Sequence, residues 1–575
     1  MADRHLITSA LPYVSGVKHL GNLAGSLLPA DVHARFLRQT GQEVLFICAT
    51  DEHGTPAELA AREAGLPVAE YCQRQHNRQA SIYRGFGLSF DHFGRTSSAR
   101  NHALTQHFYH RLDAAGLIEE RVIRQCFSPA DGRFLPDRYV VGTCPHCGNP
   151  RARGDQWEAC TRVLDPTDLI RPRSAPSGAE ELELRDTNHL FLRQSALVPE
   201  IAQWVGTQTE WSPLATSIAR AWLAAGVQDR CITRDLEWGI PVPRPGFEGK
   251  VFYVWFDAPI GYISATQEWA DADAAQRDWR RWWLGDEARR SVRYVQFLGK
   301  DNVPFHAVSF PATLIGSEEP WKSVDVIKGF NWLTYEGGKF STSEGRGIFT
   351  DAALDALPAD AWRWWLVSNA PESADTDFDL GRFATDVNSD LADSFGNLAN
   401  RLLTFTATRF GGTVPAGGEP GPAEADAARR LAEHLGALRS HHAGLRFRKA
   451  AAEIRAIWSL ANSYVAASAP WTRLRSDPGG AAVALRTALS LLDASARVAW
   501  AFVPAAASRV LQALGDADTE LPAWPGSGEA AIAQVSAGRP VSIPPLLFRK
   551  IDLIEVERLR RRFSGHSGEA ARRHA

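Results

Sequence analysis

The chain has 575 residues, of which 45% are hydrophobic and 22% are charged, with seven cysteines and a formal net charge of −3. This composition is typical of a soluble globular protein of three or four domains, and it excludes a basic coat that would bind nucleic acid over the whole surface. No apolar run approaches about 18 residues, the N-terminus lacks a secretory signal, and the cysteines are too few for a disulfide framework, so we expect a cytoplasmic protein without a membrane partner.

The N-terminal part of the chain predicts a doubly wound α/β domain. An apolar run at 4–14 ends in a turn, residues 20–40 have apolar positions at helical spacing, and residues 43–50 suit a buried parallel strand. Ligands of such domains lie beyond the carboxyl ends of the strands. We therefore expect the segments LPYVSG (11–16) and TDEHG (50–54) at the ligand-binding edge.

The rest of the chain divides by its pattern into three further regions. Residues 116–230 contain a Cys-x-x-Cys and several prolines and glycines, which predicts an inserted domain. Strand-like runs at 251–257 and 292–298 predict that the sheet then resumes. From about residue 386 the apolar positions follow a helical period, interrupted by a loop expected at 411–426.

Two short motifs suit the binding of phosphate. His19-Leu20-Gly21-Asn22 follows the first strand, where a glycine lets a nucleotide approach the backbone and His and Asn can bond to phosphate oxygens. A helix-capping role for this motif is an equally good interpretation. GGKFSTS (337–343) combines a Gly-Gly hinge, a lysine and three hydroxyls, which favours a mobile phosphate-gripping loop or, alternatively, a surface turn.

Together and in this order, the two motifs resemble the paired signatures of class I aminoacyl-tRNA synthetases. Longer segments resemble the methionyl-tRNA synthetase family in sequence and order from about residue 4 to 560: SALPYVSGVKHLGN, FICATDEHGTP, ITRDLEWGIPVP, YVWFDAPIGYISA, FLGKDNVPFH and GFNWLTYEGGKFSTS. The resemblance implies a methionine–tRNA ligase that activates methionine with ATP and Mg²⁺ and transfers it to the 3′ adenosine of tRNA(Met).

The resemblance also implies the architecture of the α/β fold. We expect a class I Rossmann-like catalytic domain with an inserted knuckle domain, followed by an all-α anticodon-binding bundle. No tRNA-binding barrel is recognisable after the bundle, so we expect a monomer. The expected domains are the first catalytic half (1–115), the insertion (116–230), the second catalytic half (231–320), the signature-loop and stem-contact segment (321–385), the anticodon-binding domain (386–545), and the C-terminal helix and tail (546–575).

By the same resemblance, site roles carry over residue by residue. Asp51 is expected to hold the methionine ammonium, unless it only caps a helix at 55–64, and Arg234 to neutralise carboxylate or phosphate charge. A thioether favours an apolar, aromatic-walled slot. The expected methionine pocket comprises Ala10, Leu11, Tyr13, Trp255, Pro259, Tyr262, Asn302 and His306. The expected ATP contacts are His19, Gly21, Asn22, Gly299, Asp301, Lys339 and Ser341. The expected catalytic set is His19, Asn22, Arg234, Lys339 and Thr342.

In the helical part the resemblance implies an anticodon-binding site. Asn397 and Arg401 are four residues apart and share one helix face, while Pro470-Trp471 ends another helix. An aromatic face for stacking, with Asn and Arg for base edges, suits an unstacked CAU anticodon. The Asn and Arg pair alone is also explained by a solvated helix face.

The chain departs from the family pattern in its second signature. Thr342 stands where the family has a second lysine, which would face the triphosphate, and Glu344 makes the local charge less favourable. Loss of this cation predicts weaker stabilisation of the transition state, with Arg346 as a candidate substitute.

The expected metal knuckles depart from the family pattern as well. Cys144, Cys147 and Cys160 match three ligands of a zinc site, but Trp157 stands at the fourth position, so either zinc or simple packing explains the cysteines. A second knuckle is expected to hold no metal, because serines stand at its cysteine positions 128, 174 and 177.

Two rival functions follow from these departures. One is a catalytically weakened paralogue that serves as a methionine sensor, an adenylate source or a back-up synthetase. Thr342 favours it, as does the single methionine, Met1, which would let the chain be made when methionyl-tRNA is scarce. A compositional bias of the source, or protection from methionine oxidation, also explains the single methionine. The anticodon set favours the ligase instead. The other rival is a non-catalytic tRNA-binding protein, against which His19, Asp51 and Arg234 argue.

Overall fold

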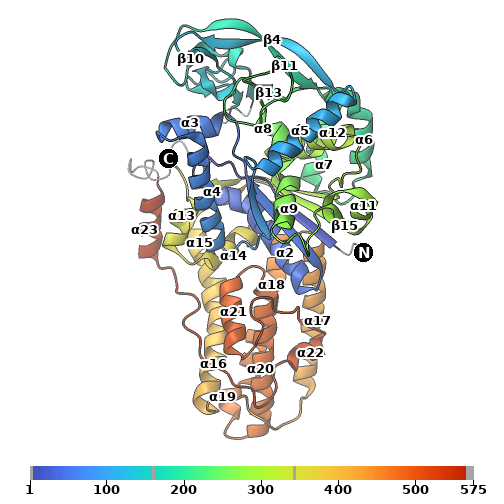
Figure 1. Cartoon of the computed structure of the whole chain (residues 1–575). Helices are drawn as coiled ribbons and strands as arrows, with labels where there is room; N and C mark the ends of the chain where they lie inside the picture. Colours follow the sequence, from blue (N-terminus) through green and yellow to red (C-terminus); the bar gives the residue numbers. More distant parts are fainter. Residues whose placement is uncertain (1–3, 158–159, 161, 341–344, 565–575) are drawn as a thin grey trace.

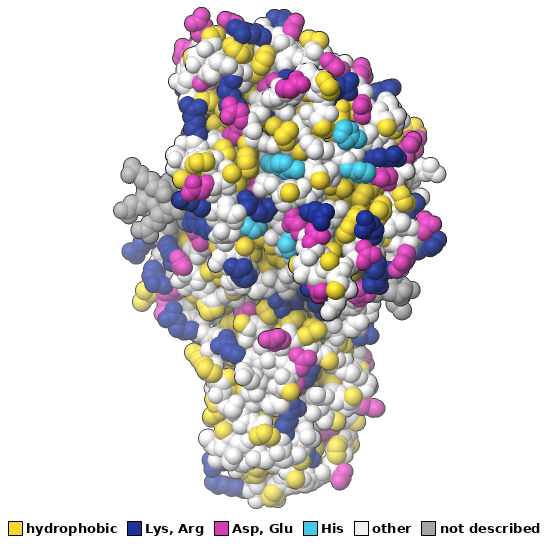
Figure 2. Space-filling model, viewed as in Figure 1, with side chains coloured by type: hydrophobic (Ala, Val, Ile, Leu, Met, Phe, Trp, Pro, Cys, Tyr) yellow, Lys and Arg dark blue, Asp and Glu magenta, His cyan; other side chains and the backbone are white. Residues whose placement is uncertain are grey.

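The computed structural model describes residues 4–157, 160, 162–340 and 345–564. In Figure 1 an α/β body lies between a β-rich insertion at one end and a bundle of long helices at the other. None of the helices within the described residues combines the length and the apolarity needed to cross a membrane. Charged side chains of both signs are interspersed over the face seen in Figure 2, as the composition predicts.

A parallel sheet of five strands forms the centre of the body. The strand order is β16-β15-β1-β2-β3, and every neighbouring pair is parallel. The strands are β1 (Arg4–Ser9), β2 (Glu43–Thr50), β3 (His92–Arg95), β15 (Val292–Gly299) and β16 (Val326–Phe330). Because parallel strands are covered on both faces, their sequences are nearly continuous apolar runs. The predicted strands at 43–50 and 292–298 are thereby confirmed.

Helices and helical turns surround this sheet. They are α1 (Leu20–Asn22), η1 (Leu23–Leu27), α2 (Leu28–Gln39), α3 (Thr55–Glu63), α4 (Val68–Gly85), α5 (Ala99–Ala114), α8 (Val254–Asp257), α9 (Gly261–Asp271), α10 (Arg280–Trp283), α11 (Gly285–Ser291), η5 (Lys300–Asn302), η6 (Phe305–Ser309) and α12 (Phe310–Gly316). The strand predicted at 251–257 is wrong beyond its first two residues, because the chain turns into α8 at Val254. A short buried apolar run fits a strand or a helix equally well, and here tertiary packing selects the helix.

The insertion is built on one long antiparallel pair, β4 (Ile118–Ser128) and β11 (Glu183–Leu192). Its short elements are β5 (Arg133–Phe134), η2 (Asp137–Tyr139), β6 (Val140–Thr143), β7 (Ala152–Arg153), β8 (Asp155–Gln156), β9 (Val163–Leu164), η3 (Pro166–Asp168) and β10 (Ile170–Ser174). The return to the body consists of η4 (Gln194–Leu197), α6 (Val198–Thr207), α7 (Pro213–Ala224), β12 (Arg230–Cys231), β13 (Thr233–Arg234) and β14 (Val251–Phe252).

After the sheet, the chain is mostly helical. The elements are β17 (Leu333–Tyr335), α13 (Thr350–Ala356), α14 (Ala359–Ser368), β18 (Thr376–Phe378), α15 (Leu380–Val387), η7 (Asn388–Gly396), α16 (Asn397–Arg409), α17 (Pro422–Ala443), α18 (Phe447–Ser468), α19 (Pro470–Arg473), α20 (Pro478–Ala499), α21 (Pro504–Ala513), α22 (Gly528–Ile532) and α23 (Leu553–Phe563). The loop expected to continue to residue 426 ends earlier, because Pro422 opens α17, a position at which proline costs no hydrogen bond.

Buried ion pairs join the bundle to the sheet body. The guanidinium of Arg363, on α14, donates to Asp31 on α2 at 2.7 Å and also to the carbonyls of Phe86, Ala501 and Phe502. Both charged side chains are fully buried, so the pair fixes α14 on α2. At the other end of the chain, α23 packs against α15, as Figure 1 shows.

Candidate active site at the carboxyl edge of the parallel sheet

The first signature begins where β1 leaves the sheet. His19 caps α1, because its Nδ1 accepts from the backbone N–H of Gly21 at 3.1 Å, and its own N–H donates to Asn22 Oδ1 at 3.2 Å. The predicted capping role is therefore present. Burial, helped by Lys18, lowers the pKa of His19 to about 3, so the ring is neutral at physiological pH. With Nδ1 as acceptor, Nε2 carries the hydrogen and is left as a donor for a phosphate oxygen.

The second signature is held directly against the first. The N–H of Leu20 donates to the carbonyl of Ile348 at 3.0 Å, and the N–H of Thr350 donates to the carbonyl of Lys18 at 2.9 Å. The rings of His19 and Phe340 stack with centroids 4.5 Å apart. The structure thus brings together two motifs that lie far apart in the sequence. Of the predicted residues of the second signature, Ser341 and Thr342 lie outside the described residues.

A tight hairpin carries the start of this second signature. Glu336 and Gly337 both have positive φ, at 47° and 73°, and Lys339 is exposed with its ammonium 5.1 Å from the ring centroid of Trp332. Arg346 donates to the carbonyls of Tyr335 and Glu336 at 3.0 and 3.1 Å. The guanidinium therefore supports the hairpin backbone through one of its terminal nitrogens.

Asp51 lies at the carboxyl end of β2, beside the segment that follows β1. Its N–H donates to the carbonyl of Pro12 at 2.9 Å, and its carbonyl accepts from Val14 at 2.7 Å. The side chain is buried, and Oδ1 has no hydrogen-bond partner within the described part of the chain. Burial, then the neighbouring Asp257 and Glu52, raises the pKa of Asp51 well above its usual value. Such a carboxylate is suited to a cationic partner.

The alternative role of Asp51 as a helix cap is wrong. Helix α3 begins at Thr55, its N-cap is Gly54, and no side chain caps it. Gly54 has a φ of 87°, a conformation that residues other than glycine rarely adopt. The backbone therefore turns between Asp51 and the helix, which leaves the carboxylate at the edge of the sheet.

The predicted pocket residues come from four segments around the same edge. Ala10, Leu11 and Tyr13 follow β1, Trp255 lies on α8, Pro259 and Tyr262 lie before and on α9, and Asn302 and His306 follow β15 on η5 and η6. Trp255 stacks on Phe305 at 3.8 Å between centroids, and Tyr13 meets the Trp255 ring edge-on at 6.4 Å. Phe305, which the sequence-based prediction omitted, therefore belongs to the aromatic wall.

A chain of hydrogen bonds fixes the polar groups of this pocket. His306 Nδ1 lies 2.9 Å from the carbonyl oxygen of Asn302, so Nδ1 carries the hydrogen and Nε2 accepts from the Tyr262 hydroxyl at 3.0 Å. The Tyr262 oxygen in turn accepts from Gln296 Nε2 at 3.0 Å. Burial lowers the pKa of His306 to about 4, which keeps it neutral. Gln296 is a further residue that the sequence-based prediction missed.

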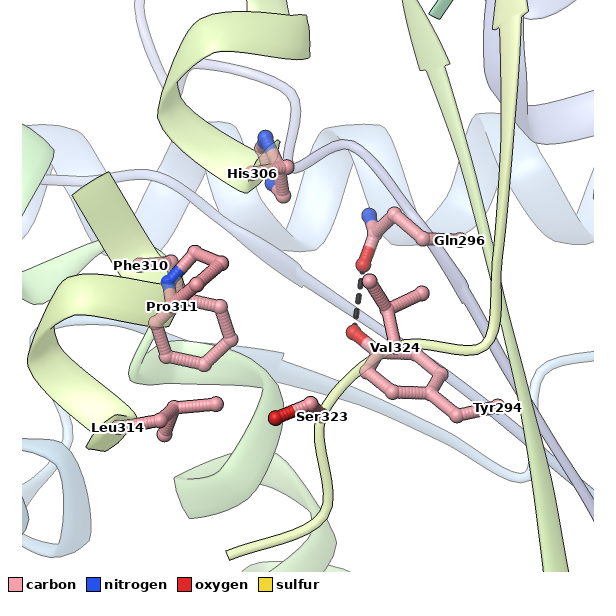
Figure 3. Close-up of a pocket in the computed structure, with 8 residues that line it drawn as sticks. All are labelled: Tyr294, Gln296, His306, Phe310, Pro311, Leu314, Ser323 and Val324. Atoms are coloured by element: carbon pink, nitrogen blue, oxygen red, sulfur yellow. Dashed lines mark hydrogen bonds between the residues drawn. The ribbon is translucent and has the colours of Figure 1, made fainter. Parts of the chain in front are cut away.

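A small cavity of about 10 Å³ lies behind His306. Figure 3 shows Gln296 and Tyr294 on one side of it and Phe310, Pro311 and Leu314 on the other, with the Tyr294 hydroxyl bonded to Gln296 at 2.6 Å. The volume is about that of one water molecule. The floor of the pocket is therefore tightly packed and polar on one side.

Residues expected to contact ATP lie where β15 ends. A Cβ on Gly299 would come within 2.7 Å of Asp301 Oδ1, so any larger residue here would displace the Asp301 carboxylate. Asp301 is exposed on η5, and Lys300 beside it bonds to Asp375 at 2.8 Å. A ribose could reach the Asp301 carboxylate from solvent at this position.

Arg234 lies at the end of β13, and its side chain bonds to a residue of the insertion. Its Nε donates to Asp137 Oδ2 at 3.0 Å, a terminal nitrogen donates to the carbonyl of Thr233 at 2.9 Å, and its guanidinium carbon lies 3.7 Å from the ring centroid of Tyr253. Asp137 has a φ of 49°, which is strained for a residue other than glycine. Asp137 was not predicted, since nothing in its local sequence links it to Arg234.

Comparisons with known proteins identify the family. Residues 5–403 match the family model of class I tRNA synthetases (M), and residues 414–568 match that of the anticodon binding domain of methionyl tRNA ligase. Methionine–tRNA ligases of Streptomyces avermitilis and Cereibacter sphaeroides are each 56% identical to the chain over 570 residues, which is 98% of this chain and 99% of each relative. The chain belongs to the methionyl-tRNA synthetase family.

The fold agrees with this membership. The structure of Mycobacterium tuberculosis methionyl-tRNA synthetase in complex with methionyl-adenylate superposes with a TM-score of 0.75 at 25% identity, over 95% of this chain and 99% of that one. The class I Rossmann-like architecture with a helical C-terminal domain is thereby confirmed.

The predicted anticodon residues lie together at the end of the family's helical domain. Helix α18 ends at Ser468, and Ala469 adopts a left-handed conformation with a φ of 35°, which turns the chain so that Pro470 opens α19. The guanidinium carbon of Arg401 lies 4.8 Å from the ring centroid of Trp471. Asn397 and Arg401 are exposed on the same face of α16. Arg401 thus lies over the ring of Trp471, whereas Pro470 is buried beneath the turn.

The three cysteines expected to bind metal also lie together. The sulfur atoms of Cys144, Cys147 and Cys160 all lie within 4.8 Å of one another. Trp157 packs against the same small core of the insertion. Three thiolates suit zinc by donor type, but the tryptophan supplies no fourth ligand.

Proposed function

We propose that this chain is a methionine–tRNA ligase whose active site is the carboxyl edge of the parallel sheet. The observation that carries the proposal is the direct pairing of the two signatures beside a buried carboxylate, one oxygen of which has no hydrogen-bond partner among the described residues. His19 stacks on Phe340, and Asp51 lies across the same edge. A catalytically inactive tRNA-binding protein would gain nothing from burying Asp51, because this burial costs stability.

In the proposed first step the methionine carboxylate attacks the α-phosphorus of ATP in line, and pyrophosphate leaves. Asp51 binds the ammonium, and the neutral Tyr262–His306 pair lies beside the thioether in the aromatic slot. His19 donates from Nε2 to a phosphate oxygen, and Lys339 supplies positive charge on the loop. These residues position the substrates and stabilise charge, and no covalent enzyme intermediate is needed.

Arg234 is proposed to neutralise the reacting carboxylate or phosphate. Its guanidinium has one side on Tyr253 and bonds through Nε to Asp137. One terminal nitrogen donates to the carbonyl of Thr233, so the other terminal nitrogen is the one proposed to meet a substrate anion. The Asp137 contact thus fixes the plane of the guanidinium before the substrate arrives, which reduces the entropy lost on binding.

In the proposed second step a ribose hydroxyl of the terminal adenosine of tRNA(Met) attacks the acyl carbon, and AMP leaves. Selection of the tRNA takes place at the opposite end of the molecule, where Trp471 offers a face for stacking and Asn397 and Arg401 offer hydrogen-bond donors. Single-stranded bases are typically bound by this combination of aromatic and polar groups.

The proposed function involves Mg²⁺ at the ATP phosphates and allows zinc in the insertion. Mg²⁺ would be held mainly by the ATP phosphates and would supply charge neutralisation there. Zinc would be held by Cys144, Cys147 and Cys160, with a structural role in the insertion. We also propose that the chain acts as a monomer in the cytoplasm.

The direct test is methionine-dependent exchange of pyrophosphate into ATP, followed by charging of tRNA(Met). Both activities are expected, and leucine or isoleucine should replace methionine poorly. A chain that binds tRNA(Met) but shows no exchange with any amino acid would contradict the proposal.

A further inference from the structure

A second cluster in the insertion has three hydroxyls around one carboxylate oxygen. The hydroxyls of Ser128 and Ser174 donate to Asp131 Oδ2 at 2.6 Å each, and that of Ser177 donates at 2.8 Å. Ser128 and Ser174 are buried, whereas Asp131 is half-buried. The four residues come from two turns, 128–132 and 174–178, which lie face to face. We name the two turns the serine turns.

Both serine turns have the backbone geometry of the cysteine turn at 144–148. In each of the three turns a glycine at the fifth position donates to the carbonyl of the first residue, at 2.8 Å for Gly132, 3.1 Å for Gly148 and 2.9 Å for Gly178. Each of these glycines has a positive φ, between 66° and 75°. The three turns therefore place their first and fourth side chains on the same side of the loop.

In each of the three turns the first side chain accepts from a backbone N–H of the same turn, that of the fourth residue in the serine turns and of the third residue in the cysteine turn. Ser128 Oγ accepts from the N–H of Asp131 at 3.1 Å, and Ser174 Oγ accepts from Ser177 at 3.3 Å. In the cysteine turn, Cys144 Sγ accepts from the N–H of His146 at 3.4 Å. Such bonds to the first ligand atom orient it toward the centre of the site.

We propose that the serine turns form a metal-free knuckle, in which the carboxylate of Asp131 takes the place of a metal ion at the centre. The polarity is inverted. A metal knuckle holds a cation among anionic thiolates, whereas here an anionic oxygen is held among three hydroxyl donors. Charge-assisted O–H···O⁻ bonds of this length are about twice as strong as neutral ones, so they can fasten two turns together.

The charge state of Asp131 agrees with this arrangement. Burial acts to raise its pKa, but the bonds from the three serines outweigh burial and lower it below the usual value. The carboxylate is therefore ionised at neutral pH, as an acceptor of three hydroxyls requires. The stabilisation of the two serine turns by Asp131 is expected to be complete above the pKa of an unfolded aspartate, and to be lost as the pH falls through the lowered pKa of Asp131.

The metal-free knuckle supports the segment that contacts Arg234. The N–H of Ala175, within one serine turn, donates to the carbonyl of Tyr139 at 2.8 Å. Tyr139 ends η2, the turn that begins with Asp137, and its hydroxyl bonds to Glu58 on α3. The knuckle thus fixes η2 on the catalytic body without requiring zinc.

The first test converts the centre back to a metal site. The variant Ser128→Cys/Asp131→Cys/Ser174→Cys/Ser177→Cys places four thiols at the four positions, and it is expected to bind one equivalent of zinc more than the parent chain. Mass spectrometry of metals and the thiolate-to-cobalt absorption after Co²⁺ loading measure this gain. The matched control keeps Asp131 and carries only the three Ser→Cys changes, and its gain should be weaker. A folded quadruple variant with no added metal would overturn the proposal.

The second test removes the centre of the knuckle, and it decides the matter even if the quadruple variant does not fold. Asp131→Ala should raise hydrogen exchange at 128–132 and 174–178 at least tenfold. Asp165→Ala, which removes another carboxylate of the insertion that caps a turn, serves as the control and should leave both segments protected. Unchanged exchange in Asp131→Ala refutes the metal-free knuckle.

Discussion

Replacement of Asp51 by asparagine should separate substrate binding from stability. The change keeps the shape of the side chain and removes the negative charge proposed to face the methionine ammonium. Removing one partner of a buried, hydrogen-bonded charge pair costs about 2 to 4 kcal/mol of binding free energy. Because 1.4 kcal/mol corresponds to a factor of ten, the KM for methionine should rise about 30- to 1,000-fold in pyrophosphate exchange, with a smaller change in the KM for ATP.

The same variant should be no less stable than the parent. Burial, Asp257 and Glu52 raise the pKa of Asp51 well above its usual value, so ionisation at neutral pH opposes folding. A raised carboxyl pKa means that the parent loses stability relative to Asp51→Asn as the pH rises above the pKa of an unfolded aspartate. The Tm of Asp51→Asn relative to that of the parent should therefore be higher at pH 8 than at pH 5.

Asp31→Asn is the matched control at another buried carboxylate, whose pKa is lowered where that of Asp51 is raised. This substitution is therefore expected to reduce the stability of the fold. Burial acts to raise the pKa of Asp31, but Arg35 and Arg363 outweigh it and lower the pKa from 3.8 to about 2. That difference corresponds to about 2 to 3 kcal/mol of stability, present at neutral pH and lost as the pH falls toward 2. The assignment of Asp51 is refuted if Asp51→Asn destabilises as Asp31→Asn does, or if it leaves the methionine KM unchanged.

Three further predictions test other parts of the site. Thr342→Lys should raise kcat of pyrophosphate exchange about 10- to 100-fold with little change in the methionine KM, because the restored cation acts on the transition state; an unchanged kcat would show that the chain supplies this charge elsewhere. Trp471→Ala should lower kcat/KM for tRNA charging about 5- to 150-fold, since base stacking contributes about 1 to 3 kcal/mol, while exchange is unaffected; the exposed Trp222→Ala is the control, and equal losses in both assays would indicate a folding defect. Tyr262→Phe leaves His306 and Gln296 each short of one partner and should raise the methionine KM about 5- to 150-fold, whereas an unchanged KM would place the thioether elsewhere.

The sequence by itself determined the family, the order of the signatures and the edge at which the site lies. The strands at 43–50 and 292–298 are apolar runs of the length that a covered parallel sheet requires, and the residues after them had to lie at its carboxyl edge. This reasoning placed Asp51 at the edge, whereas its expected role came from the family resemblance. The resemblance supplied the pocket residues, because each stands inside a long block whose order is fixed.

Tertiary structure alone decided which partner each polar side chain bonds to. The strand predicted at 251–257 is wrong from α8 onward, since a buried apolar run has no periodicity that separates helix from strand. Asp137 pairs with Arg234 across a separation of 97 residues. Asp131 accepts hydrogen bonds from three serines, the most distant of which is 46 residues away. Local propensity says nothing about such contacts, because they exist only after the insertion has folded onto itself and onto the sheet, where burial makes an unpaired charge costly enough to select its partner.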